Sequence, residues 1–468
     1  RKDGGTAVEQ QNKTGQGAAA RSLTAGPITG TLLRFAVPMI LGDLLQQMYN
    51  VADTLIVGQF VGADALAAVG SAYTLMTFLT SILLGLSMGA GVAVSISFGR
   101  HDADRMRSEV FLSFVMIAAV AAVINIGVFA GIDPILSLLQ VPPEVWDLMR
   151  EYLWAIFFGI GGTFLYNYYA SMLRAVGDSV RPLFFLGFAA ALNVVLDLAF
   201  VLGLNAGVAG AAWATVISQW LSGIGLCIYA LATRPDLRLR RQDLRWDGAR
   251  AGHVFRLAFI TGAQQSIMNF GILMVQGRVN SFGPAVMAAF AAAVKIDSFA
   301  YMPVQDFGNA FSTFIAQNYG AGQGGRIRRG TRSAILTSML FGAAISAAVF
   351  VLARPLMLIF VQPTETEVLA IGVQYLRIEG AFYCLIGLLF LLYGFYRAIE
   401  RPGMSVVLTV ISLGLRVVLA YGLSAIPALG VAGIWASIPI GWAIADLVGC
   451  VPLAGFLRRL KQAPADPK

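Results

Sequence analysis

The sequence predicts an all-α polytopic membrane protein with twelve transmembrane helices, arranged as two pseudo-symmetric six-helix bundles. Composition, the length of the apolar segments and an internal repeat together predict this fold class. Of the 468 residues, 57% are hydrophobic and 12% are charged, whereas soluble proteins carry about 25% charged residues. The mean hydropathy is +0.74. A water-soluble domain of this size could not bury so much apolar surface.

The apolar segments are long enough to cross a bilayer as helices, which takes about 20 residues each. They are too long and too uniformly apolar for the short alternating strands of a membrane barrel. In chain order the twelve predicted spans are 31–57, 66–98, 108–130, 146–172, 182–203, 208–232, 253–281, 286–317, 333–353, 367–396, 403–424 and 430–457.

Lys and Arg residues are concentrated in alternate connections between the spans. Most of the 33 lie in the two tails or in the even-numbered connections. The opposite connections hold almost none, and residues 58–65, 131–146, 204–207, 362–366 and 425–429 contain no Lys or Arg. By the positive-inside rule, both termini are expected on the cytoplasmic side of the cell inner membrane. The net charge of +8 is thus a signal of topology, and no nucleic-acid partner is expected.

Similar strings recur at a spacing of 221 to 223 residues. The string Gly-Val-Ala-Gly at 207–210 recurs at 430–433, and Gly99 matches Gly320. Two halves of six spans each would insert with the same orientation and relate by an axis along the membrane normal. The expected organisation is an N-terminal tail (1–30), an N-lobe (31–232), a cytoplasmic linker (233–252), a C-lobe (253–457) and a C-terminal tail (458–468).

Ionisable residues inside the predicted spans need a reason, because each costs roughly 2.5–3.5 kcal/mol or more at the bilayer centre. The candidates are Asp43, Asp53, Asp197, Lys295, Asp297, Asp306, Arg377, Glu379, Arg416 and Asp446.

Three spans of the first half bring oxygen-bearing side chains to one depth. From the helical rise, Asp53, Asp197 and Thr215 each lie about 8–12 Å below the outer surface. Asn193 shares a helix face with Asp197 at a spacing of four residues. Carboxylate, amide and hydroxyl oxygens can hold a dehydrated Na⁺, and a carboxylate can instead hold a proton. The alternative is that these groups only hydrogen-bond between helices.

A second set of side chains is predicted to line a substrate cavity. Aromatic and thioether groups suit bulky apolar cations, although ordinary helix packing is the alternative for each of them. The charged members in the second half could equally belong to a structural ion-pair network. The set predicted from the residues is Gln46, Tyr49, Asn50, Met172, Lys295 and Glu379. Pro38, inside the first span, allows a bend that could couple cation binding at Asp53 to helix shape.

Eight strings, spread over about residues 30–457, resemble the MATE (multidrug and toxic compound extrusion) transporters. They are Pro38-Met39-Ile40, Gln47 to Asp53, Leu66 to Gly70, Leu173 to Asp178, Asn193 to Asp197, Gly207 to Thr215, Gln317 to Gly322 and Leu392 to Arg397. The resemblance implies a MATE-type fold and a secondary antiporter. Such a protein exports amphipathic, often cationic, drugs or toxic metabolites in exchange for H⁺ or Na⁺, and needs no cofactor besides this coupling ion.

The pattern looks most like the DinF-type prokaryotic branch of that family. The resemblance implies that Asp53, Asn193, Asp197 and Thr215 form the N-lobe cation site, and would be the Na⁺ ligands in a sodium-coupled protein. A family asparagine on the fourth helix falls on Asn167.

Other functions remain as alternatives. The nearest is a lipid-linked saccharide flippase of the same superfamily, although the Lys and Arg residues lie mostly in loops rather than in a basic central cavity. A membrane-embedded enzyme is not expected, because the spans show no serine–histidine pair, metal-ligand cluster or phosphate loop. A channel would need a selectivity filter or a multimeric pore. The expected partners are a small-molecule substrate and the lipid bilayer, and we expect a monomer.

Overall fold

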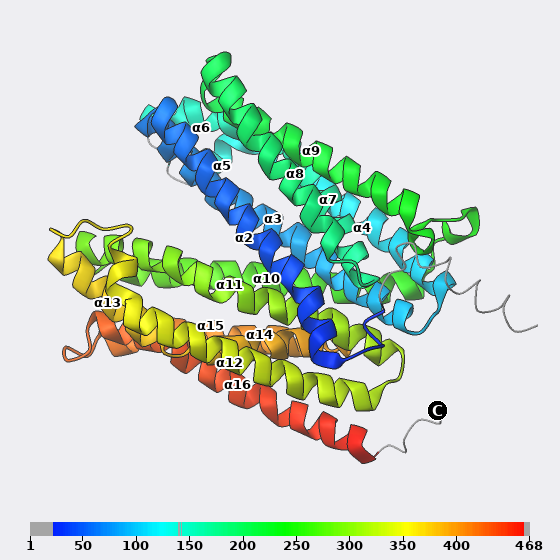
Figure 1. Ribbon diagram of the computed structural model, residues 1–468. Helices are drawn as coiled ribbons and strands as arrows, with labels where there is room; N and C mark the ends of the chain where they lie inside the picture. The colour runs from blue at the N-terminus through cyan, green and yellow to red at the C-terminus, as the bar shows by residue number, and fades with distance from the viewer. Residues whose placement is uncertain (1–21, 139–140, 142, 463–468) are drawn as a thin grey trace, which may run out of the picture.

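The computed structural model describes residues 22–138, 141 and 143–462, and every regular element in them is helical (Figure 1). Most of the two predicted tails lies outside the described residues. In chain order the elements are α2 (Ile28–Phe60), α3 (Ala63–Gly99), α4 (Ala103–Ala130), α5 (Ile132–Leu138), α6 (Pro143–Ile156), η1 (Phe157–Gly159), α7 (Ile160–Ala175), α8 (Val180–Asp197), η2 (Leu198–Gly203), α9 (Gly207–Thr233), η3 (Pro235–Leu237), η4 (Arg241–Asp243), α10 (Gly248–Asn280), α11 (Pro284–Gly320), α12 (Gly324–Met357), α13 (Thr366–Gly380), α14 (Tyr383–Ala398), α15 (Pro402–Ser424) and α16 (Val431–Gln462).

The predicted spans correspond to these helices in order. Within the described residues, ten helices are long and apolar enough to cross a membrane, and α13 with α14 forms an eleventh that is bent by 51°. The predicted span 146–172 is divided, because the 3-10 turn η1 interrupts the helix between α6 and α7. The predicted span 182–203 is α8 continued by the π-helical turn η2.

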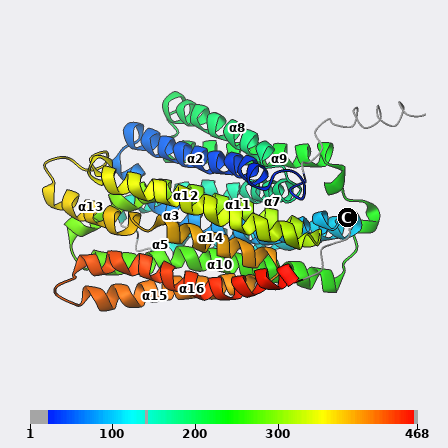
Figure 2. The ribbon, with the colours of Figure 1, turned by 60° about the horizontal axis from the view of Figure 1, so that its bottom comes forward.

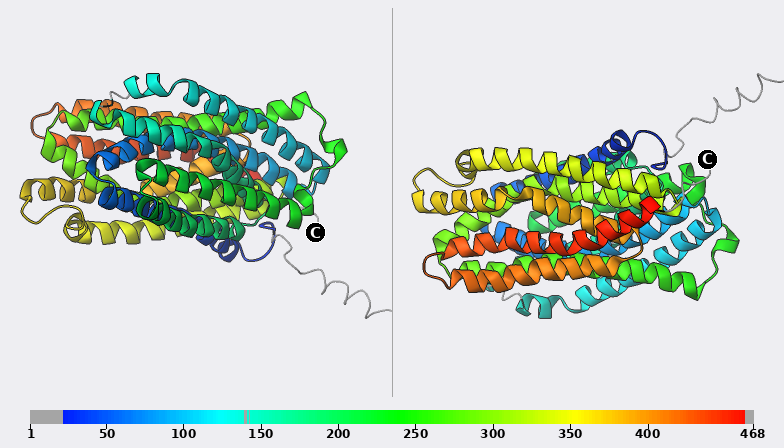
Figure 3. Two further views of the ribbon diagram at one scale, coloured as in Figure 1. Left: turned by 90° about the horizontal axis from the view of Figure 1, so that it is seen from above. Right: turned by 90° about the horizontal axis from the view of Figure 1, so that it is seen from below.

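The helices form two bundles, an N-lobe of α2–α9 and a C-lobe of α10–α16 (Figures 1 and 2). Each lobe has its own hydrophobic core. Phe157 and Tyr168 are fully buried in the N-lobe core. In the C-lobe core, the rings of Phe290 and Trp435 stack with centroids 5.5 Å apart. The outer faces, which α8 and α9 cover on one side and α12, α15 and α16 on the other (Figure 3), carry many exposed apolar side chains, as expected of a surface that contacts lipid.

The internal repeat is visible in the turns. Gly62 between α2 and α3 has φ 125°, and Gly283 between α10 and α11 has φ 97°. Gly207 at the start of α9 and Gly430 just before α16 also have positive φ. Only glycine adopts this region readily, so equivalent turns keep glycine at equivalent positions of the two halves.

The lobes meet most closely where α3 and α11 end. A Cβ atom added at Gly99 would lie 2.0 Å from the Gln317 carbonyl oxygen, and one added at Gly320 would lie 2.0 Å from the Ile96 carbonyl oxygen. No side chain larger than hydrogen fits at either position. We call this region, where residues 96–99 meet residues 317–320, the closed end. The two bundles diverge from it toward α5 and α13 (Figure 1).

The N-terminal segment adds further bonds at the closed end. The Leu23 backbone N–H donates to Gln317 Oε1 at 2.9 Å, and Gln317 Nε2 donates to the Ala175 carbonyl at 2.8 Å. Arg326 on α12 donates to the carbonyls of Gly26 and Leu23. A fully buried glutamine thus joins the N-lobe, the C-lobe and the N-terminal segment.

Candidate cation site and substrate cavity

Asn193 and Thr215, both predicted for the N-lobe cation site, are in direct contact. Asn193 Nδ2 donates to Thr215 Oγ1 at 3.2 Å, which links α8 to α9. The Thr215 hydroxyl donates in turn to the Ala211 carbonyl of its own helix. This leaves Asn193 Oδ1 free to face the site.

Asp197 ends α8 and is fully buried. The chain changes there from α-helical to π-helical pairing in η2. Single π turns inside helices occur frequently at functional sites, because they redirect one side chain without ending the helix. Nothing in the predicted apolar span indicated this turn.

The carboxyl groups of Asp53 on α2 and Asp197 on α8 lie close enough to share a hydrogen bond when one of them carries a proton. Two ionised carboxylates at this separation repel each other strongly, so both cannot stay charged without a cation between them. The structure thus joins the two acidic residues that the sequence placed at one depth on separate helices.

Several oxygen atoms at this site are shielded from solvent and accept no hydrogen bond from a described residue. They are Asp53 Oδ1, Asn193 Oδ1 and both carboxylate oxygens of Asp197. An unpaired buried acceptor costs free energy, so native structures nearly always supply a partner for it. With the Thr215 hydroxyl, these oxygens are the donor set that a hard monovalent cation prefers. The described residues contain no cluster of three or more His, Cys, Asp or Glu that could hold a metal ion.

Two tyrosines flank the acidic pair. Tyr152 on α6 is buried and lies within electrostatic range of both Asp53 and Asp197. Tyr49, one turn before Asp53 on α2, lies within range of Asp53 and of Tyr166. The sequence analysis selected Tyr49 but missed Tyr152, since only the packing of α6 against α3 and α9 brings that residue to the site.

The other residues predicted for the N-lobe cavity lie around this site without bonding to the acidic pair in the described structure. Asn50 Nδ2 donates to Gln47 Oε1 at 3.1 Å, and Gln46 is half-buried one turn away. Asn167 donates within its own helix, α7. Met172 is fully buried in the N-lobe core, where it acts as a packing residue in this conformation.

In the C-lobe, Glu379 belongs to a buried polar cluster and Lys295 does not. Glu379 on α13 lies within electrostatic range of Asp297 on α11 and Arg416 on α15. The Tyr383 hydroxyl donates to Asp297 Oδ1 at 2.7 Å. Lys295 is exposed and forms no ion pair with a described residue. An ion-pair network that includes Lys295 is therefore absent from the described part of the C-lobe.

A second acidic pair joins the two lobes. The carboxyl groups of Asp43 on α2 and Asp306 on α11 lie close enough to share a hydrogen bond when one of them carries a proton, with Arg174 of α7 in electrostatic range. The contact of Asp306 is thus with the other lobe. Pro38 lies inside α2, which continues as one helix on both sides of it.

The family model for MatE matches residues 38–199 and 258–422. The chain is 29% identical over 394 residues to the probable multidrug resistance protein YpnP of Bacillus subtilis, covering 84% of this chain and 87% of that protein. It is 25% identical over 432 residues to the FAD transporter of Shewanella oneidensis, covering 89% and 92%. A solved structure described as the outward-facing conformation of a multidrug resistance MATE family transporter superposes with a TM-score of 0.89 at 22% identity, covering 95% of this chain and 99% of that one. Since the family model spans most of both lobes, the chain belongs to the MatE family of transporters.

Proposed function

We propose that this MATE secondary antiporter exports amphipathic, often cationic, drugs or toxic metabolites across the cytoplasmic membrane in exchange for H⁺ or Na⁺. The observation that carries the proposal is the contact between Asp53 and Asp197, buried in the N-lobe beside oxygens without a partner. Members of this family are transporters, and no enzymatic step is part of the proposal.

The coupling ion is a substrate of this transporter. A proton would be shared by the Asp53 and Asp197 carboxyl groups. A sodium ion would be held by the same two carboxylates with Asn193 Oδ1 and Thr215 Oγ1. These residues lie on α2, α8 and α9, so ion binding draws three helices of one lobe together.

Ion binding can drive export only when the ion and the drug have different affinities for the two orientations of the transporter. Asp197 is at the junction of α8 and η2, so a change in its partners alters the path of this helix. Pro38 removes one backbone hydrogen bond of α2 and provides a second position for bending. Neutralising the acidic pair would thereby reshape the N-lobe face and release the drug.

We propose that the drug binds between the lobes, next to this site. The residues assigned to its cavity are Gln46, Tyr49, Asn50 and Asn167 from the N-lobe, with Lys295 and Glu379 from the C-lobe. Because Glu379 is buried in this conformation, its contact with substrate requires a rearrangement of α13.

The closed end is assigned to the cytoplasm, with both termini on that side of the inner membrane. Arginines of the predicted cytoplasmic connections, such as Arg100, Arg326 and Arg401, lie at this end, and the opposite connections hold almost no Lys or Arg. The lobe boundaries proposed from the repeat are 31–232 and 253–457. Placement in the DinF-like branch is supported by the N-lobe set of Asp53, Asn193, Asp197 and Thr215. We propose that the protein acts as a monomer.

The test is efflux of a fluorescent cationic dye from proteoliposomes with a Na⁺ gradient or a pH gradient imposed separately. We expect one of these gradients to accelerate efflux, and protein-free liposomes to show no response. Because one relative is named as an FAD transporter, an anionic flavin nucleotide belongs in the substrate panel. Efflux at the same rate with and without both gradients would contradict antiport and favour a passive pathway.

A further inference from the structure

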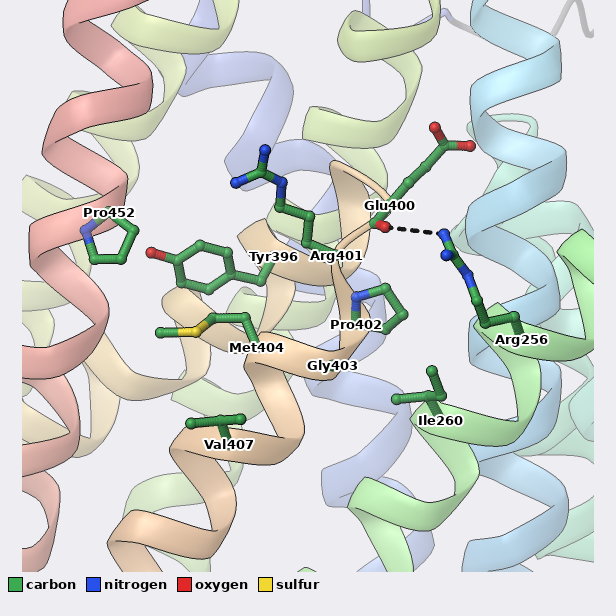
Figure 4. Close-up of a pocket in the computed structure, with 10 residues that line it drawn as sticks. All are labelled: Arg256, Ile260, Tyr396, Glu400, Arg401, Pro402, Gly403, Met404, Val407 and Pro452. Carbon is green, nitrogen blue, oxygen red and sulfur yellow. Dashed lines mark hydrogen bonds between the residues drawn. The ribbon is translucent and has the colours of Figure 1, made fainter.

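A pocket of about 580 Å³ lies near the closed end, where α10, α14, α15 and α16 meet (Figure 4). None of the residues assigned to the cation site or to the drug cavity lines it. It faces the end of the molecule that the distribution of arginine assigns to the cytoplasm. Transport as proposed above gives it no role.

The pocket changes from charged to apolar along α15. Arg256 and Arg401 lie on one side of it, and Ile260 and Val407 lie on the other (Figure 4). Met404 is between them on the wall that α15 contributes. The step from residue 401 to residue 407 is about 9 Å along a helix axis. Charge at one end and an apolar wall over this depth match the interface between headgroups and acyl chains.

The single carboxylate of the pocket is already neutralised by groups outside it. His253 Nε2 donates to Glu400 Oε1 at 2.7 Å. Arg100 and Arg105 also lie within electrostatic range of Glu400 and, with His253, lower the pKa of its carboxyl group. The Glu400 carboxylate is therefore held by a hydrogen bond from outside the pocket and faces Arg100 and Arg105 there, and no ion pair joins it to Arg256 or Arg401 among the described residues.

The two pocket arginines have unused donors. Arg256 donates one bond, at 3.4 Å, to the Glu400 carbonyl. The Arg401 guanidinium makes no hydrogen bond or ion pair with a described residue. Arg401 is also the N-cap of α15, which lacks a side-chain cap, so the positive end of the helix dipole adds to the potential there. The combined field favours an anionic group such as phosphate.

We propose that this pocket binds one anionic phospholipid of the inner leaflet. The phosphate lies at the charged end of the pocket, which Arg256 and Arg401 line, and an acyl chain lies against Met404 and Val407. A free phosphate would not need the apolar wall, which continues beyond the pocket, since Val407 is 47% and Val410 is 51% exposed. The lipid would hold α10 beside α15, and α10 packs in turn against α3 of the other lobe.

The test is native mass spectrometry of the delipidated full chain, titrated with phosphatidylglycerol or phosphatidylcholine. We expect wild type to retain one phosphatidylglycerol in preference to phosphatidylcholine. The double variant Arg256→Ala, Arg401→Ala should weaken phosphatidylglycerol binding roughly 30-fold. This figure assumes that each basic side chain contributes the attraction that it has near an anionic membrane surface. The matched control is Arg328→Ala with Arg329→Ala, which removes two exposed arginines of α12 outside the pocket.

A second variant fills the pocket without changing its charge. A Cβ atom added at Gly403 meets no atom within 4 Å, so Gly403→Leu should fold normally and block the lipid. If the double arginine variant fails to fold, phosphatidylglycerol binding by Gly403→Leu alone tests the proposal. Equal binding of the two lipids, an equal loss in the control variant, unchanged binding by Gly403→Leu, or displacement of the lipid by inorganic phosphate would each overturn the proposal.

Discussion

Gly99 and Gly320 are equivalent residues of the two halves, and each lies against a backbone carbonyl of the other lobe. Gly99 faces the carbonyl of Gln317, and Gly320 faces that of Ile96. The same spacing of 221 residues separates Ile96 from Gln317 and Gly99 from Gly320. The repeat therefore does more than duplicate a fold, because it builds a self-complementary contact at the closed end.

Gly99→Ala should destabilise this conformation. Its methyl group would lie 2.0 Å from the Gln317 carbonyl oxygen, so α3 and α11 must separate. We expect a lower apparent melting temperature in detergent. Gly70→Ala on the same helix is the control, since its added Cβ has no neighbour within 4 Å and alanine favours a helix by about 1 kcal/mol. Similar melting temperatures for both variants would show that the helices are not in close contact.

Asp178→Ala should be far more damaging than Asp133→Ala. Asp178 pairs with Arg234, and both side chains are less than one-tenth exposed. Removing one partner of a buried ion pair costs about 3–5 kcal/mol. Asp133 pairs with Arg150 in an exposed contact, where solvent screens the attraction. Thermal unfolding of both variants measures the difference, and an equal loss would contradict the assigned burial.

Thr215→Val should weaken binding of the coupling ion while the protein folds and inserts. The change keeps the shape of the side chain but removes the acceptor of the Asn193 amide and one candidate ligand. Because a hydrogen bond to a charged group contributes about 1.5–3 kcal/mol, the ion concentration for half-maximal efflux should rise about tenfold. Thr233→Val, at the far end of the same helix, is the control. If the ion dependence of efflux is unchanged in Thr215→Val, the Thr215 hydroxyl is not a ligand of the coupling ion.

The bond between His253 and Glu400 should make stability depend on pH in the acid range. The hydrogen bond from His253 lowers the pKa of Glu400 from its ordinary value of 4.5. Stability from the ionised carboxylate is therefore fully present above 4.5 and is lost as the pH falls through the lower pKa of the folded state. The difference in melting temperature between wild type and Glu400→Gln should shrink on acidification. If the difference in melting temperature grows on acidification instead, the pKa of Glu400 is raised in the folded protein, which would contradict the prediction.

Much of the fold and part of the candidate site could be predicted from the sequence. The spans follow from local hydropathy, and the common depth of Asp53 and Asp197 follows from helical rise along α2 and α8. Tyr152 could not be predicted, because its place beside Asp53 depends on how α6 packs. The proximity of Asp306 to Asp43 could likewise not be predicted, because it crosses the lobe interface, where local periodicity carries no information.

The acidic pair is the centre of this account, and its removal is the most direct test. Asp53→Asn and Asp197→Asn should each abolish efflux driven by the ion gradient in proteoliposomes, while insertion and melting temperature stay near wild type. Asp446→Asn is the matched control, because Asp446 is also a buried carboxyl inside a span but lies on α16 in the other lobe. Loss of driven efflux in the first two variants with retention in the third is the predicted result. Driven efflux at the wild-type rate in Asp53→Asn or Asp197→Asn would contradict the account.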